Sequence, residues 1–172
     1  MNIEIRKGDI TRVETDAIVN AANSTLLGGG GVDGAIHRAA GKQLLAECRQ
    51  LRETTLKDGL PAGQAVATDG YELPARWVIH TVGPVYAKTK DKSGILASCY
   101  RESLRVADEI GATSVAFPAI SAGIYGWPMD SATQIAVDTV LDADTQVETV
   151  VFVPFSADAE TAFQAALDAA RA

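Results

Sequence analysis

Two asparagines and one aspartate surround a run of four glycines near the start of the chain. Asn20 and Asn23 precede the glycines at 28–31, and Asp33 follows them. Glycine lets a backbone approach phosphate oxygens closely, and the N-terminus of a following helix adds N–H donors and a positive dipole. A phosphate cradle with a carboxylate beside it indicates a site that holds a nucleotide and acts on it chemically.

The glycine run also has a simpler interpretation. Flexible surface loops are often rich in glycine, and Asp33 could occupy the first turn of a helix because the helix dipole favours a carboxylate there. The run, however, lies between an apolar segment at 17–19 and a helical segment that starts near Val32. Such a strand-to-helix junction favours phosphate binding over an ordinary loop.

A second glycine loop occupies residues 118–128, between another apolar segment and another expected helix. Its two glycines flank Ile124 and Tyr125, and a backbone of this kind can curl around a diphosphate. We expect Tyr125 to line a ligand pocket and Trp127 to pack in the core. Two such loops at one sheet edge predict a ligand with two phosphates.

Asp9 follows the first expected strand and stands between Gly8 and Ile10. An aspartate beside glycine and threonine commonly caps a turn or a short helix. The alternative is a binding role, in which its carboxylate accepts a hydrogen bond from the amino group of an adenine. The residues around Asp9 leave both alternatives open.

Strand and helix patterns alternate along the chain, which predicts one α/β domain over residues 1–172. A three-layer α/β/α arrangement is expected, with a mixed, largely parallel central sheet. Ligands of such sheets sit at the carboxyl ends of the strands. The expected strands cover 3–5, 17–19, 65–68, 77–82, 114–117 and 149–153, and the expected helices cover 32–53 with a break near Gly41, 93–110, 129–141 and 159–170.

The composition excludes several classes of protein. A hydrophobic content of 47% over 172 residues excludes a disordered chain, and no apolar run is long enough to span a membrane. The first residues lack the layout of a signal peptide, and Cys48 and Cys99 lack disulfide-scaffold spacing, so a reduced, cytoplasmic location is expected. The net charge of −7 argues against broad nucleic-acid binding. We expect a monomer.

The order of these motifs resembles that of a macrodomain. It is especially similar to the MacroD-type branch of bacterial ADP-ribose hydrolases, also described as O-acetyl-ADP-ribose deacetylases. The similarity covers essentially the whole chain, and the pairing of Asn-Ala-Ala-Asn with Gly-Gly-Gly-Gly-Val-Asp-Gly is highly specific. The matching segments are 8–11, 16–23, 28–41, 80–84 and 118–128.

The resemblance implies a role for each matching position. Asp9, with the Ile10 backbone beside it, would bind the adenine amino group, and Phe155 would lie against the adenine ring. Asn23 would hold the distal ribose, and Asp33 would be the acid of the catalytic loop. Further ligand contacts are implied at Asn20, Gly30, Gly31, Val32, Ser121, Ala122, Gly123, Ile124 and Tyr125.

The number of acids in the catalytic loop limits the chemistry. The substrate of the family carries ADP-ribose linked through its distal ribose. Most glycosidases use two carboxylates, one of which protonates the leaving group. This loop offers only Asp33, so the leaving group must depart unaided, and a carboxylate can do so because its conjugate acid has a pKa of about 4. The expected activity is hydrolysis of ADP-ribose from Glu or Asp of proteins, deacetylation of O-acetyl-ADP-ribose, or both.

The expected partners are ADP-ribose and ADP-ribosylated proteins, with no cofactor. No metal is expected, because the two histidines, His37 and His80, lack ligand spacing, and both should be structural. The alternative function is an ADP-ribose reader without turnover. Readers usually lose the loop Asn or the loop acid, whereas this chain keeps Asn23 and Asp33. A dinucleotide oxidoreductase is excluded because no Gly-x-Gly-x-x-Gly opens the first strand–helix unit.

Overall fold

A computed structural model of the chain describes residues 1–123 and 125–172. Its strands and helices alternate along the sequence, as the apolar patterns predict. Within the described residues the strands are β1 (Asn2–Ile5), β2 (Ala17–Ala22), β3 (Ala65–Asp69), β4 (Trp77–Val82), β5 (Ser114–Phe117) and β6 (Thr149–Phe152), and the helices are the 3-10 helix η1 (Ile10–Arg12), α1 (Gly31–Ala40), α2 (Lys42–Glu53), α3 (Ser93–Ile110), α4 (Met129–Asp142) and α5 (Ala157–Arg171).

The strands form one six-stranded sheet in the order β1-β6-β5-β2-β4-β3. β3 runs antiparallel to β4, whereas the pairs β1–β6, β6–β5, β5–β2 and β2–β4 are parallel. The sheet is therefore mixed and largely parallel, as predicted, and the first strand lies at an edge. Because the parallel strands point the same way, their carboxyl ends share one edge of the sheet.

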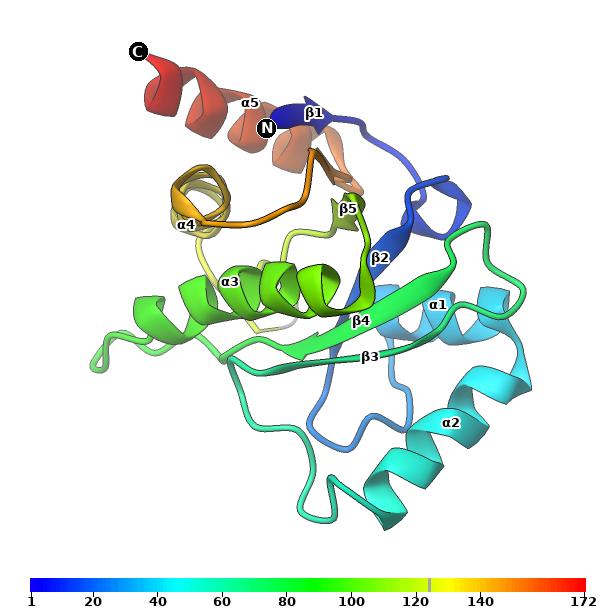
Figure 1. Cartoon of the computed structure of the whole chain (residues 1–172). Coiled ribbons are helices and arrows are strands. Elements are labelled where there is room, and N and C mark those ends of the chain that lie inside the picture. The colour runs from blue at the N-terminus through cyan, green and yellow to red at the C-terminus, as the bar shows by residue number, and fades with distance from the viewer. Residues whose placement is uncertain (124) are drawn as a thin grey trace.

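Each face of the sheet carries its own core. Val19 and Ile79 pack with residues of α3, α4 and α5, whereas Ile18 and Val78 pack with residues of α1 and α2. This division follows from the strand geometry, since successive side chains point to opposite faces. Figure 1 shows α1 and α2 on one side of the sheet and α3 and α4 on the other. The result is the three-layer α/β arrangement predicted from the sequence.

Glycines with positive φ and a capping serine set several of the helix ends. Gly41 adopts φ +90° and separates α1 from α2, and Gly111, in the left-handed region at φ +80°, ends α3. α5 begins two residues earlier than predicted, because the Ser156 side chain caps it by accepting a hydrogen bond from Ala159 N at 3.2 Å. In the described part of the chain, no helix is both long and apolar enough to cross a membrane.

One segment near the predicted site differs from expectation. β2 continues to Ala22, so Asn20 lies within the strand, which the sequence predicts to end at residue 19. The strand continues because Asn20 and Ala22 are in parallel register with residues of β4. β1 ends at Ile5, as expected, and Asp9 caps η1, which is one of the two roles left open for it.

Candidate functional site

The predicted site residues follow strands that are neighbours in the sheet. Asp9 comes after β1 and Phe155 after β6, whereas the loop at 121–125 comes after β5 and Asn23 after β2. These four strands are consecutive in the sheet. The positions predicted for adenine, diphosphate and distal ribose therefore follow one another along the carboxyl edge.

The two residues predicted to contact adenine lie on adjoining segments. Gly8 N donates to Pro154 O at 3.1 Å, which joins the segment before η1 to the segment after β6. Asp9 Oδ1 accepts from Thr11 N at 2.9 Å and from Thr11 Oγ1 at 2.7 Å. These bonds confirm the capping role and hold the pKa of Asp9 below its usual value. Phe155 is 92% exposed, and an adenine contact at both residues stays a prediction.

The first glycine loop leads directly into α1. Gly30 precedes the helix, and Gly31 opens it with φ +59°, a conformation that favours glycine. The N–H groups of the first helical turn, which includes Val32, have no carbonyl partner within the helix, so they can bind an anion. The side chain of Ile10 is buried in the core on the α1–α2 face, which leaves its backbone for the predicted contact.

Asp33 lies in the first turn of α1 and is 4% exposed. Its Oδ1 accepts a hydrogen bond from Asn20 Nδ2 at 2.9 Å. His37 Nε2 lies 3.5 Å from the same oxygen. The amide of Asn20 therefore holds the carboxylate, and a direct ligand contact at Asn20 stays a prediction. The sequence predicts only a structural role for His37, although its spacing of four residues from Asp33 places both on one helix face.

Asn23 and Asp33 approach each other at Gly29. Asn23 Nδ2 donates to Gly28 O at 3.0 Å, and its Oδ1 accepts from Thr25 N at 3.1 Å. A Cβ atom at Gly29 would lie 3.2 Å from Asp33 Oδ2 and 3.3 Å from Asn23 Nδ2. The structure thus brings together the two residues predicted to be catalytic, around a position that has no side chain.

The second loop contains a backbone conformation that the sequence did not predict. Ser121 has φ +65°, which is unusual for a residue with a side chain, and it is 7% exposed. Its hydroxyl lies so close to Gly83 that a Cβ atom at that position would overlap it. Ala122 is half-buried and Gly123 is exposed. The predicted contact residue Ile124 lies outside the described residues.

The aromatic residues of this loop have different environments. Trp127 is 7% exposed, and its Nε1 donates to Pro84 O at 3.0 Å, which confirms the predicted core position. Tyr125 is half-buried, and its carbonyl oxygen accepts from Tyr86 N at 2.8 Å. The loop after β4 therefore supports the second glycine loop, while a ligand-facing role of the Tyr125 ring stays a prediction.

The described residues can be compared with the requirements of a metal site and of a reactive thiol. They contain no group of three or more His, Cys, Asp or Glu side chains close enough to hold a metal ion. Cys48 and Cys99 are free and buried, within α2 and α3. Burial raises the pKa of Cys48 to about 12 and also raises that of Cys99, so neither thiol is a good nucleophile.

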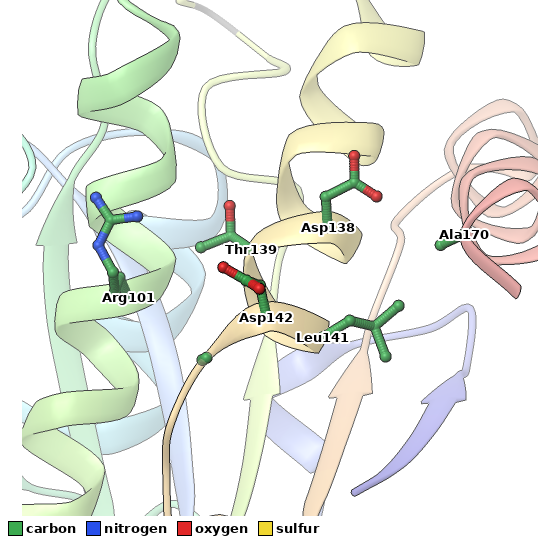
Figure 2. Close-up of a pocket in the computed structure, with 7 residues that line it drawn as sticks. Arg101, Asp138, Thr139, Leu141, Asp142 and Ala170 are labelled. Atoms are coloured by element: carbon green, nitrogen blue, oxygen red, sulfur yellow. The ribbon is translucent and has the colours of Figure 1, made fainter.

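One hollow of about 540 Å³ lies apart from these loops. Figure 2 shows Arg101 of α3 on one side of it and Asp138 and Asp142 of α4 on the other. α4 begins just after the second glycine loop and leads to the start of β6, so Asp142 at its end lies near the amino edge of the sheet. The hollow is therefore separate from the candidate site.

The macro domain family model matches residues 19–136, a span that contains both glycine loops. The chain belongs to the macro domain family. A macro domain-containing protein of Streptomyces coelicolor is 64% identical to it over 165 residues, which cover 96% of this chain and 98% of that protein.

Two further relatives are an ADP-ribose glycohydrolase and a macrodomain solved with ADP. The ADP-ribose glycohydrolase MACROD2 of Xenopus laevis is 55% identical over 140 residues, 80% of this macro domain and 32% of that longer protein. A solved structure, the Oceanobacillus iheyensis macrodomain with ADP, is 42% identical and superimposes with a TM-score of 0.94 over 98% of this chain and 91% of that one. The predicted macrodomain fold is thereby confirmed.

Proposed function

We propose that this macro domain binds ADP-ribose and hydrolyses carboxylate esters of its distal ribose. The substrates would be proteins that carry mono-ADP-ribose on Glu or Asp, and O-acetyl-ADP-ribose. The observation that carries the proposal is the convergence of Asp33 Oδ2 and Asn23 Nδ2 at Gly29, beside the N-terminus of α1. The name of the Xenopus relative, an ADP-ribose glycohydrolase, supports hydrolysis, and the ADP complex of the Oceanobacillus macrodomain supports the ligand class.

The order of the loops along the sheet edge supports this ligand. Asp9 follows β1 and Asn23 follows β2, which are three strand spacings apart. At about 4.8 Å per spacing, the ligand must reach roughly 14 Å along the edge. Adenine at Asp9 and Phe155 would place the diphosphate against the second glycine loop and the distal ribose at Asn23. Backbone N–H groups can hold the phosphates, which suits a chain with a net charge of −7.

The chemistry follows from the two oxygens of the Asp33 carboxylate. Oδ1 accepts a hydrogen bond from Asn20, whereas Oδ2 lies beside Gly29. Oδ2 would orient or deprotonate a water molecule beside the ester, and Asn23 would fix the ribose. The water oxygen bonds to the ribose carbon that bears the ester, and the bond from that carbon to the ester oxygen breaks. The carboxylate leaves with the electrons of that bond, and the proton of the water passes to Asp33 or to the ligand's diphosphate. A leaving carboxylate needs no second acid, because its conjugate acid has a pKa of about 4.

The test measures release of ADP-ribose from Glu-, Ser- and Arg-linked substrates and of acetate from O-acetyl-ADP-ribose. The wild-type protein should hydrolyse the carboxylate esters and leave the Arg-linked substrate intact. Asp33→Ala and Asn23→Ala should lower turnover by about 100-fold or more, with a much smaller loss of affinity for free ADP-ribose, since both act mainly in the transition state. Asp142→Ala, an exposed aspartate at the far edge of the sheet, is the matched control and should match the wild type.

Other results would change the conclusion. Undiminished turnover by Asp33→Ala would remove this residue from the mechanism. A wild-type protein that binds ADP-ribose but hydrolyses none of the substrates would be a reader. Loss of activity after prolonged EDTA treatment would contradict a reaction that needs no metal.

A further inference from the structure

A chain of four buried polar side chains runs from the sheet to Asp33. Thr68 Oγ1 lies 2.9 Å from His80 Nε2, and His80 Nδ1 lies 3.1 Å from Asn20 Nδ2. The same Asn20 nitrogen donates to Asp33 Oδ1 at 2.9 Å. None of the four residues is more than 4% exposed. They meet because Asn20 and His80 are register partners on neighbouring strands and point, with Thr68, to the face that α1 covers.

The hydrogen-bond donors in this chain can be assigned. The Thr68 hydroxyl donates to Asp69 O at 3.2 Å, and a hydroxyl has only one proton to donate. The Thr68 oxygen then accepts from His80 Nε2–H. Burial, and next the nearby His37, lower the pKa of His80 to about 3, so its imidazole is neutral at physiological pH. A neutral imidazole with its proton on Nε2 has an acceptor at Nδ1.

His80 thereby selects the orientation of the Asn20 amide. Because Nδ1 is an acceptor, the NH₂ group of Asn20 must face it, and the second N–H of that group points to Asp33 Oδ1. The opposite orientation would set the amide oxygen against both the imidazole lone pair and the carboxylate. In the observed orientation Asn20 Oδ1 is buried without a partner among the described residues. An unpartnered buried acceptor is unfavourable, so the two N–H bonds must hold the amide in place.

We propose that Thr68 and His80 are positioning residues that act through Asn20 to hold the Asp33 carboxylate for hydrolysis, an inference that rests on the proposed function. With Oδ1 fixed by Asn20, Oδ2 stays directed toward Gly29 and Asn23, where the ester would lie. Without an acceptor at His80 Nδ1, the amide can turn and the carboxylate loses its donor. Neither Thr68 nor His80 needs to touch the substrate.

Paired substitutions separate this role from simple support of the fold. His80→Asn keeps an oxygen acceptor near the position of Nδ1, whereas His80→Gln does not. Thr68→Ser keeps the acceptor for Nε2–H, whereas Thr68→Val removes it and lets the imidazole proton move to Nδ1. For ester-linked ADP-ribose, His80→Gln and Thr68→Val should lower kcat by about tenfold or more. KM and the Kd of ADP-ribose should change by less than about threefold, and His80→Asn and Thr68→Ser should retain kcat within about threefold of the wild type.

A double-variant comparison tests whether the effect passes through the carboxylate. In an Asp33→Asn background, His80→Gln should lower the residual rate by less than about twofold, because both changes act on the same group. A full additional loss would show that His80 acts elsewhere and would overturn the proposal. Equal kcat for the Asn and Gln variants at position 80 would also overturn it.

Nitrogen NMR of the wild-type imidazoles gives a readout that does not depend on activity. At neutral pH, His80 should carry its proton on Nε2 with an unprotonated Nδ1, and a proton on Nδ1 would overturn the inference. If the wild-type protein releases no ADP-ribose and no acetate, the proposed function and this inference fail together. If the wild type is active and His80→Gln is equally active, only this inference fails.

Discussion

A side chain at Gly34 should lower both stability and activity, because the backbone of α1 contacts the first glycine loop at this residue. A Cβ atom at Gly34 would lie 2.5 Å from Gly29 O and 3.0 Å from Arg38 Nη1. The arginine can move, but the carbonyl belongs to the loop around which Asp33 and Asn23 converge. Gly34→Ala should therefore displace this loop by several tenths of an ångström.

The expected magnitude is the balance of two opposing effects. Alanine in a helix interior is normally more stable than glycine by about 0.5–1 kcal/mol. Overpacking a tight contact costs about 1–3 kcal/mol. The net loss should reach up to about 2 kcal/mol, which for a chain of this size corresponds to a fall in Tm of roughly 4–8 °C. Turnover of ester-linked ADP-ribose should fall by about tenfold or more, because catalysis is sensitive to small displacements.

Gly94→Ala is the matched control for this prediction. Gly94 also lies in the first turns of a helix, α3, but a Cβ atom there would meet no atom within 4 Å. Thermal unfolding should show an equal or slightly higher Tm for this variant, with wild-type turnover. If Gly34→Ala gains stability as Gly94→Ala does and keeps full activity, the close contact between α1 and Gly29 is not a constraint and the reasoning is wrong.

Three further outcomes are expected. Gly123→Glu should abolish ADP-ribose binding in calorimetry. It should keep the unfolding free energy within about 0.5 kcal/mol of the wild-type value, since a Cβ atom there meets nothing within 4 Å. Undiminished affinity would remove this loop from the site. Asp9→Ala should weaken the binding of ADP-ribose by about 1–3 kcal/mol and the binding of inosine-diphosphate-ribose by less. Equal losses for the two ligands would mean that Asp9 only caps η1. The lowered pKa of His80, about 3, makes protonation favour the unfolded chain. The contribution of neutral His80 to the free energy of unfolding should be fully present above about pH 6.5. It should fall by up to about 1.4 kcal/mol per pH unit as the pH is lowered toward 3. Urea unfolding of His80→Asn should lack this slope; an unchanged slope would contradict the assignment.

Local patterns predicted most of the fold because they depend on neighbouring residues. Alternating or continuous apolar runs gave the strands, and Gly41 and Gly111 marked helix ends through their conformational freedom. The sequence predicts a strand that ends before Asn20, because a single polar residue after a short apolar run resembles a strand end. Its strand partner, His80, lies 60 residues away, and such a pairing leaves no local signal.

Some contacts of the candidate site likewise follow from local spacing, whereas others depend on residues far apart in the sequence. The contact between Asp33 and His37 could have been predicted from helical spacing, since residues four apart share a face. The left-handed backbone of Ser121 leaves no such local signal, and its hydroxyl lies beside Gly83, a residue 38 positions earlier in the chain. Asn23 and Asp33, which the motif resemblance placed at one site, both lie beside Gly29 in the structure.

The sequence by itself determined which residue types are available and where the backbone turns: two glycine loops, each between a strand and a helix, with Asn23 and Asp33 at the first. These features are local, because helix and strand patterns and glycine turns depend on residues a few positions apart. Only the tertiary structure decided that β1, β6, β5 and β2 stand side by side, so that Asp9, Phe155 and the two loops share one edge. Strand order and register are set by the burial of both sheet faces across the whole chain, and the same register placed His80 beside Asn20.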